Sequence, residues 1–169
     1  MTQFKLIFII LLTSQLVKAQ DLKVTSGVGF PDLIHIGGAY QITKTNEVAI
    51  QLGTIFTTNT LLTPSLEHRF YYRKSKKYES LNSWFFGQRL TYYYERSNEY
   101  NWHSIYLNLS IGRNYYFSEN FGFSWDAGIF FGLTNKQFNN SNGSEVEDDS
   151  PPNVPNVFPD LRIQLFRRL

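Results

Sequence analysis

The histidines and serines are the first residues to consider for chemistry, because a histidine that reaches a serine hydroxyl can activate it as a nucleophile. The chain has three histidines, His35, His68 and His103, and no cysteine. His103 is followed directly by Ser104, so on a β-strand these two side chains would point to opposite faces. A His-x-Ser spacing, which would put both groups on one face, occurs at none of the histidines. We therefore expect no catalytic residues.

Charged side chains within strand-like segments are the second candidate set. They share the parity opposite to the apolar residues, and they are Glu67, Arg69, Arg73, Arg89, Glu95, Asp126, Asp160, Arg162 and Arg168. Inside a small barrel such charges must pair, because an isolated buried charge is very costly. We expect a structural ion-pair network centred on Arg89 and Asp126. Its further members would be Glu67, Arg69, Glu95 and Arg162. A gated ion path is the alternative interpretation.

Two charge runs lie outside these segments. The first is acidic and contains Glu145, Glu147, Asp148 and Asp149 among Asn, Ser and Gly. It has no calcium-loop spacing, so a solvated loop is expected rather than a divalent cation site or a cation bridge to lipopolysaccharide. The second run contains Lys74, Lys76 and Lys77, and we expect it to form only a soluble turn. With cysteine absent as well, we expect no metal and no cofactor.

The elements that would position these side chains are β-strands, because apolar residues recur at every second position. From Ile105 to Ile111 and from Phe121 to Leu133 one face is apolar, while the other carries small and polar residues. The expected strands lie near residues 21–30, 32–43, 47–57, 65–73, 82–95, 103–117, 121–134 and 158–169. The turns at 44–46 and 118–120 would be short, and the connection over 135–157 would be long. The pattern predicts an all-β, eight-stranded antiparallel up-and-down barrel.

The start of the chain predicts export. Lys5 precedes the apolar run 6–12, polar residues follow, and Ala19 stands where a signal peptidase would cut. We expect a signal peptide at 1–19 and a single barrel domain at 20–169. Removal of Lys5 and Lys18 would reduce the 16 basic residues to 14, equal to the 14 acidic ones. Because the mature chain would have no net charge, we do not expect it to bind nucleic acid.

Large aromatic residues indicate that the barrel crosses a membrane. The apolar face of the segment 83–95 reads Trp84, Phe86, Gln88, Leu90, Tyr92 and Tyr94, with aromatic residues at both ends. Membrane barrels place Trp and Tyr at the two lipid-water interfaces. A closed barrel also satisfies every backbone hydrogen bond within a bilayer. The sequence therefore predicts a transmembrane β-barrel.

These features together resemble the small eight-stranded outer-membrane barrels, OmpX-like and OmpA-transmembrane-like proteins. Gln20 directly after the expected cut, together with the ending of the chain, looks like Bacteroidetes envelope proteins. The last segment resembles the signal that the barrel-assembly machinery recognises and carries Leu161, Ile163, Leu165, Arg167 and Leu169. It departs from that signal in ending on leucine rather than an aromatic residue. Arg167 on the lipid-facing parity would extend to the periplasmic interface.

The resemblance implies a location in the outer membrane, contact with its lipid and lipopolysaccharide, passage through the barrel-assembly machinery and a monomeric state. The implied role is structural, in surface interaction or in envelope stability, without catalysis. Two alternatives stay open. One is a soluble periplasmic barrel of the lipocalin type that carries a lipid, and the other is a barrel enzyme that modifies lipid A.

Overall fold

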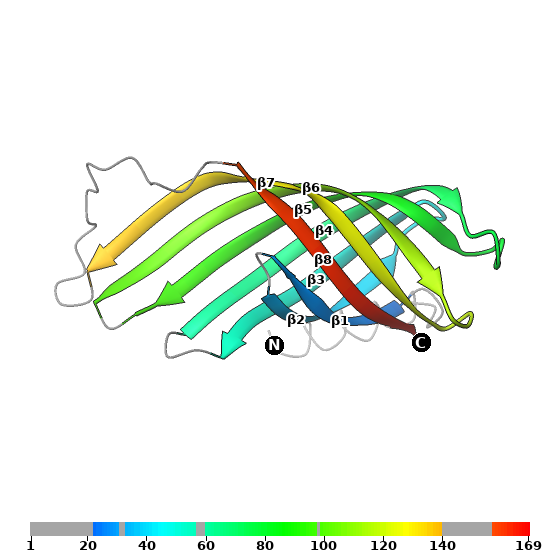
Figure 1. The fold of residues 1–169 in the computed structure, drawn as a ribbon, viewed down its shortest axis with the longest axis horizontal. Coiled ribbons are helices and arrows are strands. Elements are labelled where there is room, and N and C mark those ends of the chain that lie inside the picture. The colour runs from blue at the N-terminus through cyan, green and yellow to red at the C-terminus, as the bar shows by residue number, and fades with distance from the viewer. Residues whose placement is uncertain (1–21, 31–32, 57–59, 98, 140–156) are drawn as a thin grey trace, which may run out of the picture.

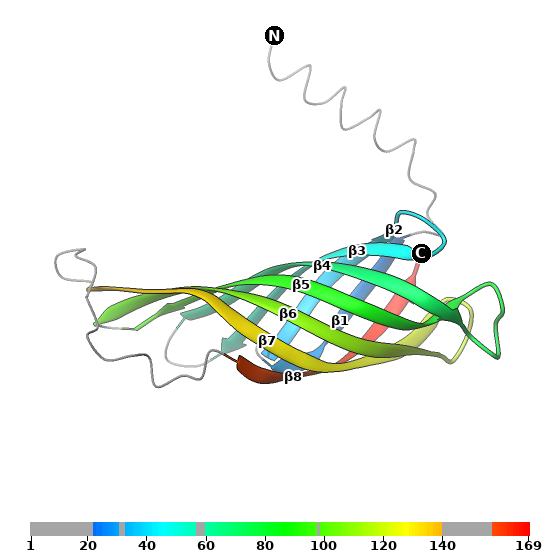
Figure 2. The ribbon, with the colours of Figure 1, turned by 90° about the horizontal axis from the view of Figure 1, so that it is seen from above.

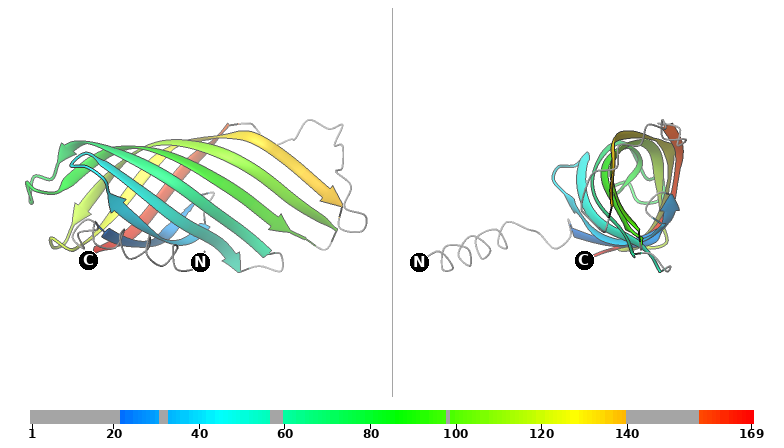
Figure 3. Two further views of the ribbon diagram at one scale, coloured as in Figure 1. Left: turned by 180° about the vertical axis from the view of Figure 1, so that it is seen from behind. Right: turned by 90° about the vertical axis from the view of Figure 1, so that its left-hand side faces the viewer.

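Eight antiparallel strands form a closed barrel in a computed structural model that describes residues 22–30, 33–56, 60–97, 99–139 and 157–169 (Figure 1). The strands are β1 Leu22–Phe30, β2 Leu33–Gln41, β3 Asn46–Phe56, β4 Thr60–Lys74, β5 Asn82–Arg96, β6 Tyr100–Tyr116, β7 Phe121–Asn139 and β8 Val157–Arg168. Each strand pairs with the next along the chain, and β1 pairs with β8 to close the ring. The end-on view in Figure 3 shows this closed wall. The predicted all-β up-and-down barrel is confirmed.

The described residues contain no helix that is long and apolar enough to cross a membrane. The expected signal peptide, residues 1–19, lies outside the described residues, and so does the acidic run of 145–149.

The barrel wall is taller on one side. β4 to β7 contain 15, 15, 17 and 19 residues, whereas β1 and β2 contain 9 each. Figures 1 and 2 show β5, β6 and β7 extending beyond the shorter strands at one end. The opposite end holds the tight turns at 42–45 and 117–120 and the paired Lys23 and Arg168, near the two ends of the barrel chain. We call the two ends the extended end and the turn end.

Side chains alternate between the inside and the outside of the barrel, and the inside is polar. On β8, Leu161, Ile163 and Leu165 are 57%, 51% and 49% exposed, while the intervening Arg162 and Gln164 are buried. Polar residues outnumber hydrophobic ones among the buried residues that the structure describes. This is the reverse of a water-soluble fold, where the apolar face of each strand would point inward.

The interior is also tightly filled. A Cβ atom added to Gly112 would lie 2.3 Å from the ring of Phe85 and 2.6 Å from the carbonyl oxygen of Trp125. Such distances are far inside van der Waals contact, so only glycine fits this inward position while Phe85 occupies the space beside it.

Aromatic side chains gather in two groups on the outside of β5, β6 and β7. At the extended end, the ring of His103 lies 5.1 Å from that of Tyr94 and 5.4 Å from that of Phe138. At the turn end the rings are those of Trp84, Tyr115, Phe117, Phe121, Phe123 and Trp125. Between the groups, the outward residues of these three described strands include no Asp, Glu, Lys or Arg. We call the two aromatic groups the extended-end girdle and the turn-end girdle.

A β-bulge near the turn end corrects one prediction. The alternation placed Arg73 inside the barrel, but Arg73 is exposed. Tyr71 pairs with Phe85 and Arg73 with Trp84, so Tyr72 is an extra residue on β4. The extra residue turns the next side chain to the other face, and Arg73 therefore shares the outer face with Trp84.

Candidate functional site

The barrel interior contains one connected polar network, and Arg162 of β8 is its junction. Its Nε donates to Asp126 Oδ2 at 3.0 Å, its Nη1 to Gln51 Oε1 at 2.7 Å and its Nη2 to Glu67 Oε1 at 2.6 Å. These partners lie on β7, β3 and β4, and all are buried. One guanidinium thus joins four strands across the lumen.

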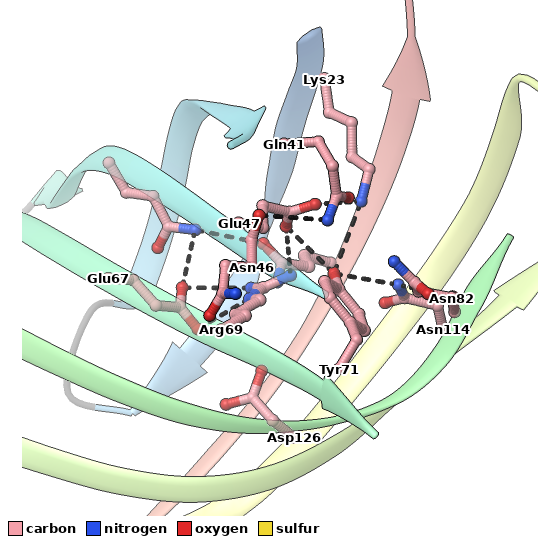
Figure 4. A network of polar contacts seen from close by, with 12 residues as sticks. Lys23, Gln41, Asn46, Glu47, Glu67, Arg69, Tyr71, Asn82, Asn114 and Asp126 are labelled. Carbon is pink, nitrogen blue, oxygen red and sulfur yellow. Dashed lines mark hydrogen bonds and ion pairs between the residues drawn. The ribbon is translucent and has the colours of Figure 1, made fainter. Parts of the chain in front are cut away.

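From Glu67 the network runs toward the turn end (Figure 4). Arg69 donates from Nε to Glu67 Oε1 at 2.8 Å, and its Nη1 lies 3.6 Å from Glu47 Oε1. Glu47 is also paired with Lys23 of β1 and accepts a hydrogen bond of 3.1 Å from the hydroxyl of Tyr71. Asn114 of β6 donates to the Tyr71 oxygen at 3.2 Å. This branch therefore connects β1, β3, β4 and β6.

A second ion pair lies toward the extended end. Arg89 Nη2 donates to both carboxylate oxygens of Asp160, at 3.0 and 2.8 Å. Asn108 also donates to Asp160 Oδ2 at 3.2 Å, and Thr91 donates to Asn108 at 3.4 Å. All four residues are buried. The Asp160 carboxylate thus links β8 to β5 and β6.

The formal charges of these ion pairs balance. The cations are Lys23, Arg69, Arg89 and Arg162, and the anions are Glu47, Glu67, Asp126 and Asp160. Each of the eight is at most 5% exposed. Taking such charges out of water is tolerable only where opposite charges and hydrogen bonds surround them. A neutral, filled lumen of this kind is suited to holding the strands together rather than to attracting an ion.

The structure places the predicted network residues, and the inward-parity Arg168, in four locations. Glu67, Arg69, Asp126 and Arg162 are directly joined, and Arg89 is paired with Asp160. Glu95 is half-buried near the extended end, where it accepts a hydrogen bond of 2.9 Å from the hydroxyl of Tyr93. Arg168 is half-buried at the turn end.

The junction of the network differs from the prediction, which centred it on Arg89 and Asp126. Asp126 and Arg162 are directly opposite each other on the neighbouring strands β7 and β8, whereas Arg89 is on β5. The pairing register therefore places Asp126 beside Arg162, and Arg162 is the residue that contacts three other strands. Alternation predicts which side chains point inward, but the stagger between strands decides which of them meet.

Sequence reasoning missed Lys23, Glu47, Gln51 and Tyr71. A usable signal was present, because Lys23 alternates with the outward Val24 and Glu47 with the outward Val48 and Ile50. β1 and β3 contain 9 and 11 residues, against 17 and 19 in β6 and β7, so fewer alternating positions reveal the pattern.

The histidines occupy three separate environments. His35 is buried inside the barrel, His68 bonds Asn46 at 3.0 Å, and His103 lies on the outer face bonded to Tyr92. Ser104 points inward and donates to Asn135 at 2.8 Å, so it faces away from His103 as expected. Within the described ranges, no three His, Asp or Glu side chains are grouped to hold a metal ion.

Two hollows open at the two ends of the lumen. The one at the extended end has a volume of about 430 Å³ and an aromatic lining that includes Tyr93, Trp102, Tyr106 and Phe130. The one at the turn end, of about 500 Å³, is polar and includes Lys23, Lys44, Lys74 and Arg168. The ion-pair network lies between them and reaches the turn-end hollow at Lys23.

No protein-family model matches the chain, and no curated protein shows significant sequence similarity to it.

Proposed function

We propose that this protein is an outer-membrane β-barrel with a non-catalytic role in the structure of the envelope or in interactions at its surface. The observation that carries the proposal is the reversed polarity of the barrel. A charged, hydrogen-bonded interior and an outer face of Leu, Ile, Val and aromatic residues suit a barrel surrounded by lipid. In water the same outer face would expose a continuous apolar surface far larger than monomeric proteins tolerate.

The spacing of the two girdles supports the proposal. Trp84 and Tyr94 stand ten positions apart on the outer face of β5. At about 3.3 Å per residue and a strand tilt of about 40°, this spacing separates them by about 25 Å along the barrel axis. That is about the height of the apolar band of outer-membrane barrels. The extended end would then face outward from the cell and the turn end the periplasm, as short periplasmic turns require.

The filled lumen favours a structural role over a gated ion path. Arg162 and its partners span the interior from β8 to β3 and β4, and the neutral network offers no excess charge to select an ion. We expect the purified barrel to carry no steady current in a planar bilayer. A reproducible ion-selective conductance would support the gated path instead.

A soluble lipid carrier is the runner-up. It needs an apolar interior, but the middle of this lumen is charged, and the aromatic hollow of about 430 Å³ lies at the extended end. A barrel enzyme acting on lipid A has less support, because His103 and Ser104 face opposite sides of the wall. Release of fatty acid from labelled lipopolysaccharide, lost in His103→Ala, would support that alternative.

Cell fractionation tests the proposal. The protein should be recovered with outer membranes, and after detergent extraction it should migrate differently in electrophoresis with and without boiling, because a closed barrel resists detergent until heated. We expect the native chain to be a monomer that contacts lipid and lipopolysaccharide and depends on the barrel-assembly machinery. Recovery in the soluble periplasm without a mobility shift would contradict the proposal and favour the lipid carrier.

A further inference from the structure

The turn-end girdle contains a row of alternating cationic and aromatic side chains. Arg73 of β4 pairs with Trp84 of β5, Trp84 with Arg113 of β6, and Arg113 with Trp125 of β7. Cross-strand partners share one face of a sheet, so these four residues form a band on the outside of the barrel. The bulge at Tyr72 brings Arg73 into the band, since regular alternation would have turned it inward.

Aromatic rings, not carboxylates, hold Arg113. The centre of its guanidinium lies 5.2 Å from the ring of Trp84 and 4.4 Å from that of Tyr115. Its Nε is buried and has no hydrogen-bond partner, and within the described chain neither Arg113 nor Arg73 has an ion-pair partner. Ring contacts fix the guanidinium plane while leaving its hydrogen-bonding capacity for an acceptor from outside.

A hollow of about 200 Å³ lies beside this row. It is lined by Arg73, Lys74, Lys76, Ser83, Trp84 and Arg113. None of these lining residues is acidic, so four basic residues border one small space. Guanidinium and ammonium groups are the side-chain groups that typically bind phosphate.

We propose that this hollow binds the phosphate of an anionic phospholipid in the periplasmic leaflet. The inference rests on the proposed function, because the hollow is at the membrane interface only if the apolar outer face is in lipid. The apolar residues next to the hollow favour a lipid over free phosphate as its ligand. Phe86 and Ile111 are the next outward pair toward the extended end after Trp84 and Arg113. The acyl chains of a lipid would lie beside this apolar pair. The lysine-rich turn thus acquires a binding role beyond solubility.

The test compares lipids that differ only in charge. The purified barrel in detergent is mixed with phosphatidylglycerol or phosphatidylethanolamine of the same chain length, and retained lipid is counted by native mass spectrometry. Each cation close to an anionic lipid contributes about fivefold to affinity, so Arg73→Gln with Arg113→Gln should weaken phosphatidylglycerol retention about 25-fold. Arg96→Gln, an exposed arginine near the opposite end of β5, is the matched control and should leave retention unchanged.

Three results would overturn the inference. They are equal retention of the two lipids by the unaltered barrel, unchanged phosphatidylglycerol retention in the double variant, and complete displacement of the lipid by millimolar inorganic phosphate. The last would assign the hollow to free phosphate. The substituted side chains are outside the packed lumen, and the heat-dependent mobility shift verifies that each variant is folded. A barrel recovered from outer membranes that shows no lipid preference would refute this inference alone, whereas recovery in the periplasm would refute the proposed function.

Discussion

Replacing Arg162 with methionine tests whether the lumenal network holds the barrel together. Arg162 makes hydrogen bonds to Asp126, Gln51 and Glu67, and it is 1% exposed. Methionine fills much of the same space but leaves the Asp126 carboxylate buried without its cation. Removing one partner of a buried ion pair costs about 3–5 kcal/mol of unfolding free energy. At about 2–4 °C per kcal/mol for a domain of this size, the unfolding midpoint should fall by roughly 10 °C.

The assay is the temperature at which the heat-dependent mobility shift is half complete in detergent, together with urea unfolding in the same micelles. A second substitution separates a charge effect from simple loss of packing. Adding Asp126→Asn to Arg162→Met removes the unpaired carboxylate, while Glu67 keeps its hydrogen bond from Arg69. The double variant should therefore be more stable than Arg162→Met alone, which is a coupling that a double-mutant cycle measures.

Arg96→Met serves as the control because Arg96 is exposed, and its midpoint should match that of the unaltered protein. An unchanged midpoint in Arg162→Met would refute the view that the network stabilises the barrel. Full additivity of Asp126→Asn and Arg162→Met would refute the specific pairing of these two residues.

Four further substitutions test the packing and the outer face. Gly112→Ala should lower the free energy of unfolding by about 1–3 kcal/mol, because its Cβ would meet Phe85 at 2.3 Å. Gly38→Ala should leave it nearly unchanged, since the nearest atom to that Cβ is 3.8 Å away. Equal effects of the two variants in urea unfolding would contradict a tightly packed interior. Leu90→Arg, midway between the girdles, should lower the free energy of unfolding in a lipid bilayer by about 2–4 kcal/mol. No change in the reconstituted barrel would indicate that position 90 lies in water. Leu133→Arg, near the extended end, should cost at most about 1 kcal/mol in the same assay, because charges near the interface are tolerated.

The sequence predicted the strand number and the facing of β5 to β8 well, because one side of each strand is mainly apolar. Leu161, Ile163 and Leu165 alternate with Arg162 and Gln164, and the structure places these sets outside and inside as the pattern indicates. Alternation depends only on local chain geometry, so it can be read without knowledge of the neighbouring strands.

The start of β4 was placed too late. The strand was expected near residues 65–73, but β4 begins at Thr60 and Pro64 pairs with Leu52 of β3. The pairs recorded between β4 and β5 end at Leu62 and resume at Ser65, so proline occupies a break in that ladder. Proline is tolerated where no ladder hydrogen bond needs its missing N–H.

The partners inside the lumen could not be predicted, because they depend on register and on one bulge. Alternation alone placed Arg73 inside, and a single extra residue at Tyr72 reversed that. The pairing of Asp126 with Arg162 and of Arg89 with Asp160 follows from the stagger of strands around the barrel, which no single segment encodes.

Measuring the depth of the outer face in a bilayer shows most directly whether the barrel spans the membrane. The chain has no cysteine, so Leu90→Cys and Glu99→Cys each provide one site for a fluorescent label on the barrel reconstituted in lipid vesicles. If the barrel spans the bilayer, lipids brominated along their acyl chains should quench the label at position 90, and aqueous iodide should quench the label at position 99. Quenching of both labels by iodide, with none by brominated lipid, would show that the apolar face lies in water and would refute a transmembrane barrel.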